Sequence, residues 1–302
     1  MILITGGTGA IGSGIVSRLS AEGKKIRLLT LPNDTKADLM SQENVEVWKG
    51  DISEKNSIRN ICKDVTTVLH LAAIIITDNK QLYNTINIDG TRNIIDEAKK
   101  DKVGHFIHFS SASVLYSQVT PYSLSKRISE SIVRDSGLLH TIIRPTLVYG
   151  RNGGLEFDLF LDYLRRFPVV PFIGNGRSIK RPVYSEDIVD GIVKAVKLDS
   201  GKGEVYNFSG KDAISMIDFA RLCLKLMGNE NKPVIYLPVW FCKFLANVSS
   251  RLSKKTLLSM STITGVTQDA DLDPSSAIRD LQYNPSSIYQ TLPKCFPREK
   301  RR

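Results

Sequence analysis

Met1-Ile-Leu-Ile-Thr-Gly-Gly-Thr-Gly-Ala-Ile-Gly12 opens the chain. Residues 2–5 are apolar or β-branched and predict a buried strand, and apolar residues then recur at helical spacing over residues 11–19. Between them, residues 7–12 match the G-x-G-x-x-G pattern. Glycine permits a tight turn and lets a pyrophosphate approach the main chain, where the helix N-terminus favours negative charge. The stretch therefore predicts a dinucleotide-binding turn; the alternative is an ordinary strand-to-helix turn.

The length and composition are those of an ordinary globular protein. A chain of 302 residues, 42% hydrophobic and 24% charged, can form one large core or one core with a smaller lobe. A strand at residue 2 leaves no room for a targeting peptide, and the apolar segment 236–246 is too short to span a bilayer. The four cysteines are scattered and predict neither a metal site nor disulfides: Cys62, Cys223, Cys242 and Cys295. We expect a cytoplasmic protein with no metal and no transmembrane segment.

The net charge of +10 bears on the choice of partner. A basic surface attracts nucleic acid, anionic lipid or a phosphorylated substrate. No nucleic-acid-binding motif is present, so we expect no nucleic-acid partner. Part of the excess is the tail, residues 298–302. A phosphate-bearing substrate is our first expectation, and a loose membrane-surface association is a minor alternative.

Strand and helix patterns alternate through the first half of the chain. Strands are expected at 26–30, 45–48, 67–72, 105–109 and 141–144, and helices at 57–63, 89–100 and 123–134. Such alternation predicts an α/β fold with a Rossmann-type, doubly wound parallel sheet. We expect residues 1–150 plus 183–209 to form the dinucleotide-binding domain. Residues 151–182 plus 210–302 are expected to form a smaller C-terminal substrate-binding lobe.

Polar residues at three places follow a predicted strand or stand near the start of a predicted helix. Ser111 closes the strand at 105–109, Tyr122 and Lys126 stand one helical turn apart, and Asn87 precedes the helix near residue 89. A tyrosine pKa of about 10 is lowered by a neighbouring cation, so the phenol could exchange a proton with an alcohol oxygen during hydride transfer. A serine hydroxyl could hold that oxygen in place. Tyr122 and Lys126 alone would also fit a chance pair on a helix.

Together these motifs resemble, in order, those of the extended short-chain dehydrogenase/reductase family, which includes NAD-dependent nucleotide-sugar epimerases and dehydratases. The resemblance runs from Met1 to about residue 290. It implies Ser111, Tyr122, Lys126 and Asn87 as catalytic residues. It implies NAD or NADP as cofactor, held by Gly6, Gly9, Ala10, Ile11, Gly12, Asp51, Ile52, Leu71, Ala72, Ala73, Tyr122, Lys126 and Pro145. Arg181 would bind a substrate diphosphate together with Ser111, and the family commonly forms homodimers through the helices that carry Asn87 and Tyr122.

Two departures from the family pattern matter. Counting back from Tyr116 would put Ala112 in the catalytic serine position, whereas counting from the strand puts Ser111 there, and we take Ser111. The end of the second strand lacks an acid where NAD-binding members hold the ribose. Asp34 falls late for that position and Lys36 is a candidate for a 2′-phosphate, so the choice between NAD and NADP stays open.

The activity is narrowed to a few alternatives. A nucleotide-sugar 4-epimerase or a 4-keto-sugar reductase is expected first, acting at a hexose carbon in surface polysaccharide biosynthesis. Thr146 and Leu147 stand where nucleotide-sugar enzymes often have asparagine, which keeps a steroid- or flavanonol-type alcohol dehydrogenase open. A lipid-linked sugar would reconcile the basic charge with the apolar segment 238–246. A non-catalytic redox-sensing NAD(P)-binding protein is the remaining alternative. A dehydratase is disfavoured because residues 111–113 lack the Asp-Glu pair.

Overall fold

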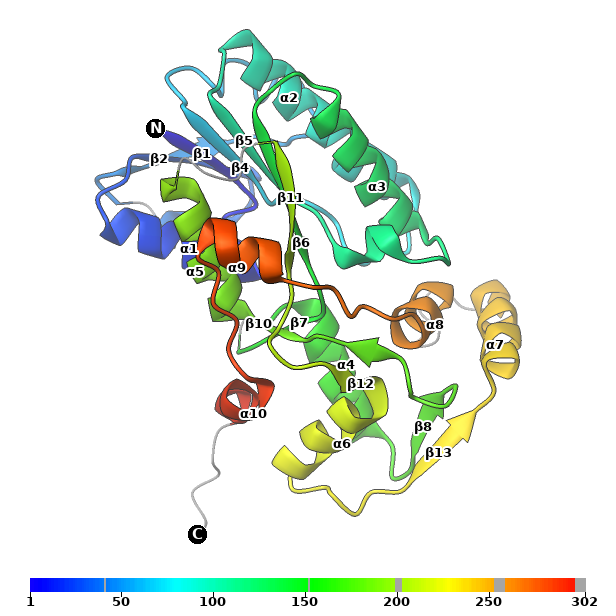
Figure 1. Ribbon diagram of the computed structural model, residues 1–302. Helices are drawn as coiled ribbons and strands as arrows, with labels where there is room; N and C mark the ends of the chain where they lie inside the picture. Colours follow the sequence, from blue (N-terminus) through cyan, green and yellow to red (C-terminus); the bar gives the residue numbers. More distant parts are fainter. Residues whose placement is uncertain (41, 152, 199–202, 253–258, 297–302) are drawn as a thin grey trace.

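Seven parallel strands form the central sheet of the computed structural model (Figure 1). The structure describes residues 1–40, 42–151, 153–198, 203–252 and 259–296. In sheet order the strands are β11 (Glu204–Phe208), β6 (His140–Pro145), β5 (His105–Phe109), β4 (Thr67–His70), β1 (Ile2–Thr5), β2 (Ile26–Thr30) and β3 (Val45–Lys49). Every pairing among them is parallel. The predicted doubly wound parallel sheet is confirmed.

Helices cover both faces of this sheet, which is why its strands are apolar on both sides. One face packs against α1 (Ala10–Ala21), α5 (Ser185–Lys197) and α9 (Ser275–Leu281). The other packs against α2 (Gly90–Lys100) and α3 (Pro121–Arg134). Neighbouring residues of β1 alternate between the two cores: Ile4 belongs to the first and Leu3 to the second.

One helix prediction needs correction. Residues 57–63 form turns rather than a helix, and Asn60 and Asp64 have φ values of 65 and 63. The apolar spacing there reflects burial, since Ile58 and Ile61 lie in the core shared with α2. The helix expected at 89–100 is confirmed as α2, and a continuous π-helical segment that includes Asn87, η2 (Tyr83–Asp89), precedes it.

The rest of the described chain forms smaller elements below the sheet in Figure 1. Its strand pairs are β7 (Val148–Tyr149) with β10 (Val183–Tyr184), β8 (Val170–Ile173) with β13 (Val234–Leu237), and β9 (Ile179–Lys180) with β12 (Ile214–Ser215). Its helices are α4 (Leu155–Arg166), α6 (Met216–Leu226), α7 (Val239–Leu252), α8 (Met260–Thr267) and α10 (Ile288–Thr291). Short 3-10 segments are η1 (Thr35–Met40), η3 (Ala112–Leu115) and η4 (Leu292–Cys295).

Part of the C-terminal segment packs against the central sheet rather than against these smaller elements. Ala277, Leu281 and Tyr283 pack into the core of the sheet, and the Tyr283 ring stacks on Phe208 at 4.4 Å. The division into a dinucleotide-binding domain and a substrate-binding lobe remains a proposal, in which this segment crosses back to the first domain.

The basic tail, residues 298–302, lies outside the described residues. No helix in the described ranges is long and apolar enough to cross a membrane.

Two histidines are buried side by side in the sheet. His70 on β4 and His108 on β5 stack with ring centroids 5.6 Å apart. His70 is hydrogen-bonded to Thr5 Oγ1 and Thr91 Oγ1, whereas neither ring nitrogen of His108 has a partner among the described residues. Burial, reinforced by the positive charge of Lys126, lowers the pKa of His70 to about 3 and the pKa of His108 well below its usual value.

This pair predicts acid sensitivity of the fold. Unfolded histidines take up protons as pH falls through about 6.5, while the folded ones stay neutral, so the free energy of unfolding falls with pH below that point. Each histidine contributes about 1.4 kcal/mol per pH unit between its unfolded and folded pKa values. We expect urea unfolding at pH 7, 6 and 5 to show a shallower decline for His108→Leu than for the wild type. An equal slope in the two proteins would contradict this account.

Candidate active site

Two glycines in the turn after β1 have no room for a side chain. Gly6 has a φ of 71, and a Cβ there would lie 2.7 Å from the Ala72 backbone nitrogen. A Cβ at Gly12 would lie 2.2 Å from the Gly6 carbonyl oxygen. The Gly9 N–H donates to the Gly6 carbonyl, and Gly9 caps α1, which begins with Ala10 and Ile11. Gly9 and Ala10 are exposed, so the N-terminus of α1 is open to an anion.

Other predicted cofactor residues follow the ends of neighbouring strands. The Leu71 and Ala72 N–H groups donate to the carbonyl and hydroxyl of Thr5, which holds residues 71–73 against the glycine turn. Asp51 lies just past β3 and accepts two hydrogen bonds from Ser53. The adjoining Ile52 is buried.

Pro145 ends β6, where it pairs with Phe208 of β11. Because all the strands are parallel, their carboxyl ends share one edge of the sheet, where ligands of doubly wound folds bind. The predicted cofactor residues thus gather at this edge from β1, β3, β4 and β6.

The sequence predicts no acid at the position that binds the ribose, but the structure places the acidic residue Asp34 at this edge of the sheet. The Thr8 hydroxyl donates to the Asp34 carboxylate at 2.6 Å, so the acid lies directly beside the glycine turn. Its other oxygen accepts the Lys36 N–H. In dinucleotide-binding folds an acid about 20 residues past the turn holds the ribose hydroxyl, and Asp34 fits that spacing. Counted from the end of the second strand, Asp34 falls late for this role, but the loop after β2 brings its carboxylate back to the glycine turn.

Ser111, Tyr122 and Lys126 meet at the end of β5. Thr120 and Ser123 form a capping box at the start of α3, which fixes Tyr122 in its first turn. The Ser111 hydroxyl hydrogen-bonds with Ser113 Oγ at 2.9 Å and lies close enough to the Tyr122 phenol to lower its pKa. Lys126 is 3% exposed, and its ammonium donates to the Phe109 carbonyl at 2.7 Å.

The neighbours of Ser111 take other positions. Ser110 donates to the buried Glu130 carboxylate at 2.6 Å. Ala112 is buried at the start of η3. Of these three positions, only Ser111 presents a hydroxyl to the Tyr122 phenol.

The electrostatics of the phenol differ from the expectation. Lys126 was expected to lower the pKa of Tyr122; instead burial raises that pKa, and the negative charge of Glu156 raises it further. The hydrogen bond from Ser111 acts in the opposite direction. Burial lowers the pKa of Lys126 itself to about 8, against the influence of Glu130. Burial is the largest of these influences on Tyr122, so the phenol is protonated at neutral pH.

Asn87 holds the segments around the site together. Its amide accepts from the Ile74 N–H and donates to the Ile74 carbonyl, and it also donates to Ser125 Oγ at 2.9 Å. The Asn87 carbonyl accepts from Ser129 of α3. Ser125 stands between Tyr122 and Lys126 on α3, so the geometry supports a positioning role for Asn87.

Arg181 is engaged within the protein. Its Nε pairs with Asp271 at 2.5 Å, and its guanidinium also donates to the Lys211 carbonyl. The neighbouring residue Lys180 is the cation that meets the loop before α3: its ammonium lies 5.4 Å from the centre of the Tyr116 ring. The structure does not bring Arg181 together with Ser111 and Tyr122 through any contact among the described residues.

Glu156 and Lys180 are charged residues that the sequence analysis missed. Burial raises the pKa of Tyr83 and of Tyr116, which reaches about 12, and the Glu156 carboxylate raises both further. Glu156 keeps exposed surface, and desolvation by the surrounding protein raises its own pKa against the influence of Lys180. Lys180 is 2% exposed, and burial lowers its pKa to about 8. No local pattern marks either residue, because α4 and β9 reach the site from the other part of the chain.

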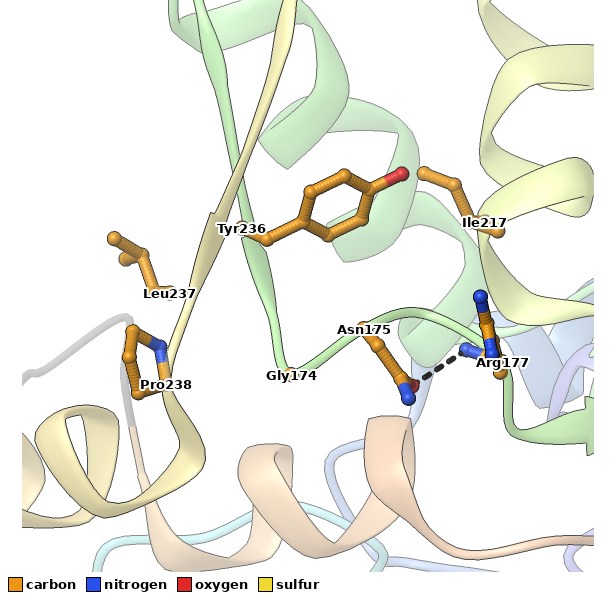
Figure 2. Close-up of a pocket in the computed structure, with 7 residues that line it drawn as sticks. All are labelled: Gly174, Asn175, Arg177, Ile217, Tyr236, Leu237 and Pro238. Carbon is orange, nitrogen blue, oxygen red and sulfur yellow. Dashed lines mark hydrogen bonds between the residues drawn. The ribbon is translucent and has the colours of Figure 1, made fainter.

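A surface hollow of about 490 Å³ lies away from these residues (Figure 2). Its walls come from the loop after β8, from α6 and from β13, and they comprise Gly174, Asn175, Arg177, Ile217, Tyr236, Leu237 and Pro238. None of the predicted site residues lines it. Among the described residues, no group of three or more His, Cys, Asp or Glu side chains could hold a metal ion.

Comparison with known proteins agrees with this geometry. The family model described as NAD dependent epimerase/dehydratase family matches residues 2–209. A 3 beta-hydroxysteroid dehydrogenase/Delta 5-->4-isomerase of Mycobacterium tuberculosis is 23% identical and aligns over 98% of this chain and 89% of its own length.

Two solved structures share the fold. A dTDP-glucose 4,6-dehydratase of Streptomyces venezuelae, bound to NAD and TYD, has a TM-score of 0.78 at 22% identity and covers 98% of this chain and 95% of its own. A UDP-glucuronic acid 4-epimerase of Bacillus cereus, in complex with NAD, has a TM-score of 0.74 at 23% identity and covers 97% and 96%.

Proposed function

The chain belongs to the NAD-dependent epimerase/dehydratase family, and we propose that within it the protein acts as a 4-epimerase or 4-keto-sugar reductase on a nucleotide sugar. It is an NAD(P)-dependent enzyme of the extended short-chain dehydrogenase type. The observation that carries the proposal is the meeting of Ser111, Tyr122 and Lys126 at the sheet edge that also bears the glycine turn.

Each of these side chains has a distinct task in the proposed reaction. The bound nicotinamide ring would supply or accept hydride at the substrate carbon. The Tyr122 phenol would exchange a proton with the oxygen on that carbon, and the Ser111 hydroxyl would hold the same oxygen by a hydrogen bond. Lys126, fixed by the Phe109 carbonyl, would hold positive charge below the site. This intact set argues against a purely redox-sensing binding protein.

The chain's own residues fit a dinucleotide. The absence of side chains at Gly6 and Gly12 lets a pyrophosphate approach the open end of α1. Asp34 would accept a hydrogen bond from the ribose 2′-hydroxyl and would repel a 2′-phosphate, so we propose NAD rather than NADP. Asp51, Ile52, residues 71–73 and Pro145 would complete the cofactor site from the neighbouring strand ends.

A nucleotide sugar is supported by the names of the two solved structures, a dTDP-glucose dehydratase and a UDP-glucuronic acid epimerase, and by the basic charge of the chain. A role in surface polysaccharide synthesis, a cytoplasmic location and a homodimer through α2 and α3 belong to the same proposal.

An apolar alcohol is the second candidate substrate. Arg181, which was expected to bind the diphosphate, is paired with Asp271. Thr146 donates to the Arg181 carbonyl and so also serves the protein's own structure. The relative from Mycobacterium tuberculosis is named for a hydroxysteroid, an alcohol without a diphosphate. These observations keep a steroid-like alcohol as the alternative to the nucleotide sugar.

Tyr122→Phe tests the proposed chemistry. Loss of the phenolic proton should lower kcat by roughly 10²–10⁴-fold on the true substrate, with little change in the affinity for NAD, because the ring remains. UDP- and dTDP-hexoses and a 3-hydroxysteroid would be assayed in parallel, with Tyr289→Phe on the exposed face of α10 as the control. Full turnover by Tyr122→Phe would overturn the catalytic assignment.

Asp34→Ser tests the proposed choice of cofactor. Removing the carboxylate should weaken NAD binding and improve NADP binding, so that the ratio of the two Kd values changes by roughly tenfold or more. Titration calorimetry measures both, and mass analysis of nucleotide released on denaturing the wild type identifies any retained cofactor. An unchanged preference would show that Asp34 does not contact the ribose.

Glu156→Gln tests the charge that the other part of the chain brings to the phenol. Without this carboxylate the pKa of Tyr122 falls, so the rise of kcat/KM with pH in the oxidative direction should shift by roughly 0.5–1 unit toward lower pH. Asp158→Asn, in the same turn of α4 and exposed, is the matched control and should leave the profile in place. Equal profiles for both variants would exclude Glu156 from the site.

A further inference from the structure

Helix α7 turns its large apolar side chains to solvent. Trp240 is 71% exposed, Phe244 59% and Val248 40%, and their spacing of four residues places them on one stripe. The opposite side of the helix is held by small residues: Cys242 and Ala246 are buried together with Ile173 and Ile263. The helix therefore packs against the protein through its small residues and exposes its large apolar side chains to solvent.

Exposed apolar side chains also occur on the adjoining elements. Ile235 and Tyr236 of β13 are each 49% exposed, and Met260 of α8 is 44% exposed. Helices α7 and α8 pack together, and Figure 1 shows them at the edge of the molecule, away from α10. The stripe on α7 together with Met260 of the packed helix α8 forms an exposed apolar patch, which indicates an interaction site rather than ordinary surface. We call it the α7 patch: Trp240, Phe244, Leu245, Val248 and Met260.

The sequence around the α7 patch carries only positive charge. From residue 231 to residue 268 there are five lysines or arginines and no aspartate or glutamate. Arg177 is exposed and lines the hollow beside Tyr236 (Figure 2). A surface that combines aromatic side chains with positive charge complements the acyl boundary and the phosphates of an anionic bilayer. A protein partner would need acidic residues of its own to match this segment.

We propose that the α7 patch docks the protein on an anionic membrane surface, with α7 lying in the plane of the interface. Trp240 and Phe244 would enter the boundary between headgroups and acyl chains, where amphipathic aromatic rings are favoured. The 14 residues of α7 span about 21 Å at the helical rise, less than a bilayer core, so the helix lies on the membrane and does not cross it.

The docking surface is joined to the Tyr122 site through α8 and the chain that follows it. The Ser117 hydroxyl, in the loop that leads into α3, donates to the Gln268 side chain at 2.7 Å. The buried Lys180 ammonium donates to the Gly265 carbonyl of α8. Membrane contact would therefore act on elements that border the active site, although docking itself does not depend on the proposed activity.

Vesicle binding provides the test. Sedimentation with phosphatidylcholine vesicles that contain about one third phosphatidylserine should bring the protein down, whereas pure phosphatidylcholine should bind it at least several-fold less. Because the chain has two tryptophans, Trp48→Phe leaves Trp240 as the single reporter, and its emission should shift to shorter wavelength on anionic vesicles.

Two variants distinguish docking through the α7 patch from nonspecific adsorption to vesicles. The Trp240→Ser/Phe244→Ser double variant should lose binding by roughly tenfold or more, since both rings are exposed and their loss leaves the core intact. Tyr289→Ser, 60% exposed on α10, is the matched control and should bind like the wild type. Failure of the wild type to bind anionic vesicles would overturn the proposal, as would equal binding by the double variant. Loss of a dimer in the double variant, without vesicle binding by the wild type, would assign the α7 patch to a second copy instead.

Discussion

The attachment of α3 to the carboxyl end of β5 is the constraint on which the site depends. Lys126 donates to the Phe109 carbonyl, while Ser110 and Arg144 converge on the Glu130 carboxylate, which is 4% exposed. A buried carboxylate in such a position is tolerable only when its oxygens are fully paired, and removing one partner of a buried ion pair costs roughly 3–5 kcal/mol. The same residues that satisfy this charge therefore hold Tyr122 above the sheet edge. Stability and the geometry of the site share one set of contacts.

Much of the sheet was predictable because the relevant signals are local. Buried parallel strands appear in the sequence as short apolar runs, and the glycine pattern marked the first turn regardless of what lies far away. The turns at 57–63 were misassigned because Ile58 and Ile61 face the core at a spacing that a helix would also produce. The π-helical segment around Asn87 has no distinct sequence pattern and was missed for that reason.

The site was less predictable because part of it is assembled across the chain. Asp34 was set aside on strand register, yet the loop after β2 turns back and its carboxylate meets Thr8. Glu156 and Lys180 arrive from α4 and β9, more than thirty residues from Tyr122 in the chain. The pKa of Tyr122 was judged from its neighbour one turn away, whereas burial, which depends on the whole fold, has the larger effect.

These differences indicate which part of the chain supplies the catalytic residues and which part determines the substrate. The sheet edge supplies the glycine turn, Ser111, Tyr122 and Lys126, a set that could serve any secondary alcohol. The charged residues near these elements come from elsewhere: Glu156 of α4 raises the pKa of the phenol, and Lys180 of β9 lies over the ring of Tyr116. Lys180 is also bonded to α8, which packs against α7 and its exposed aromatic stripe. Since function resides in sites added to a common fold, the identity of the substrate should depend on α4, β9, α7 and α8 rather than on the sheet.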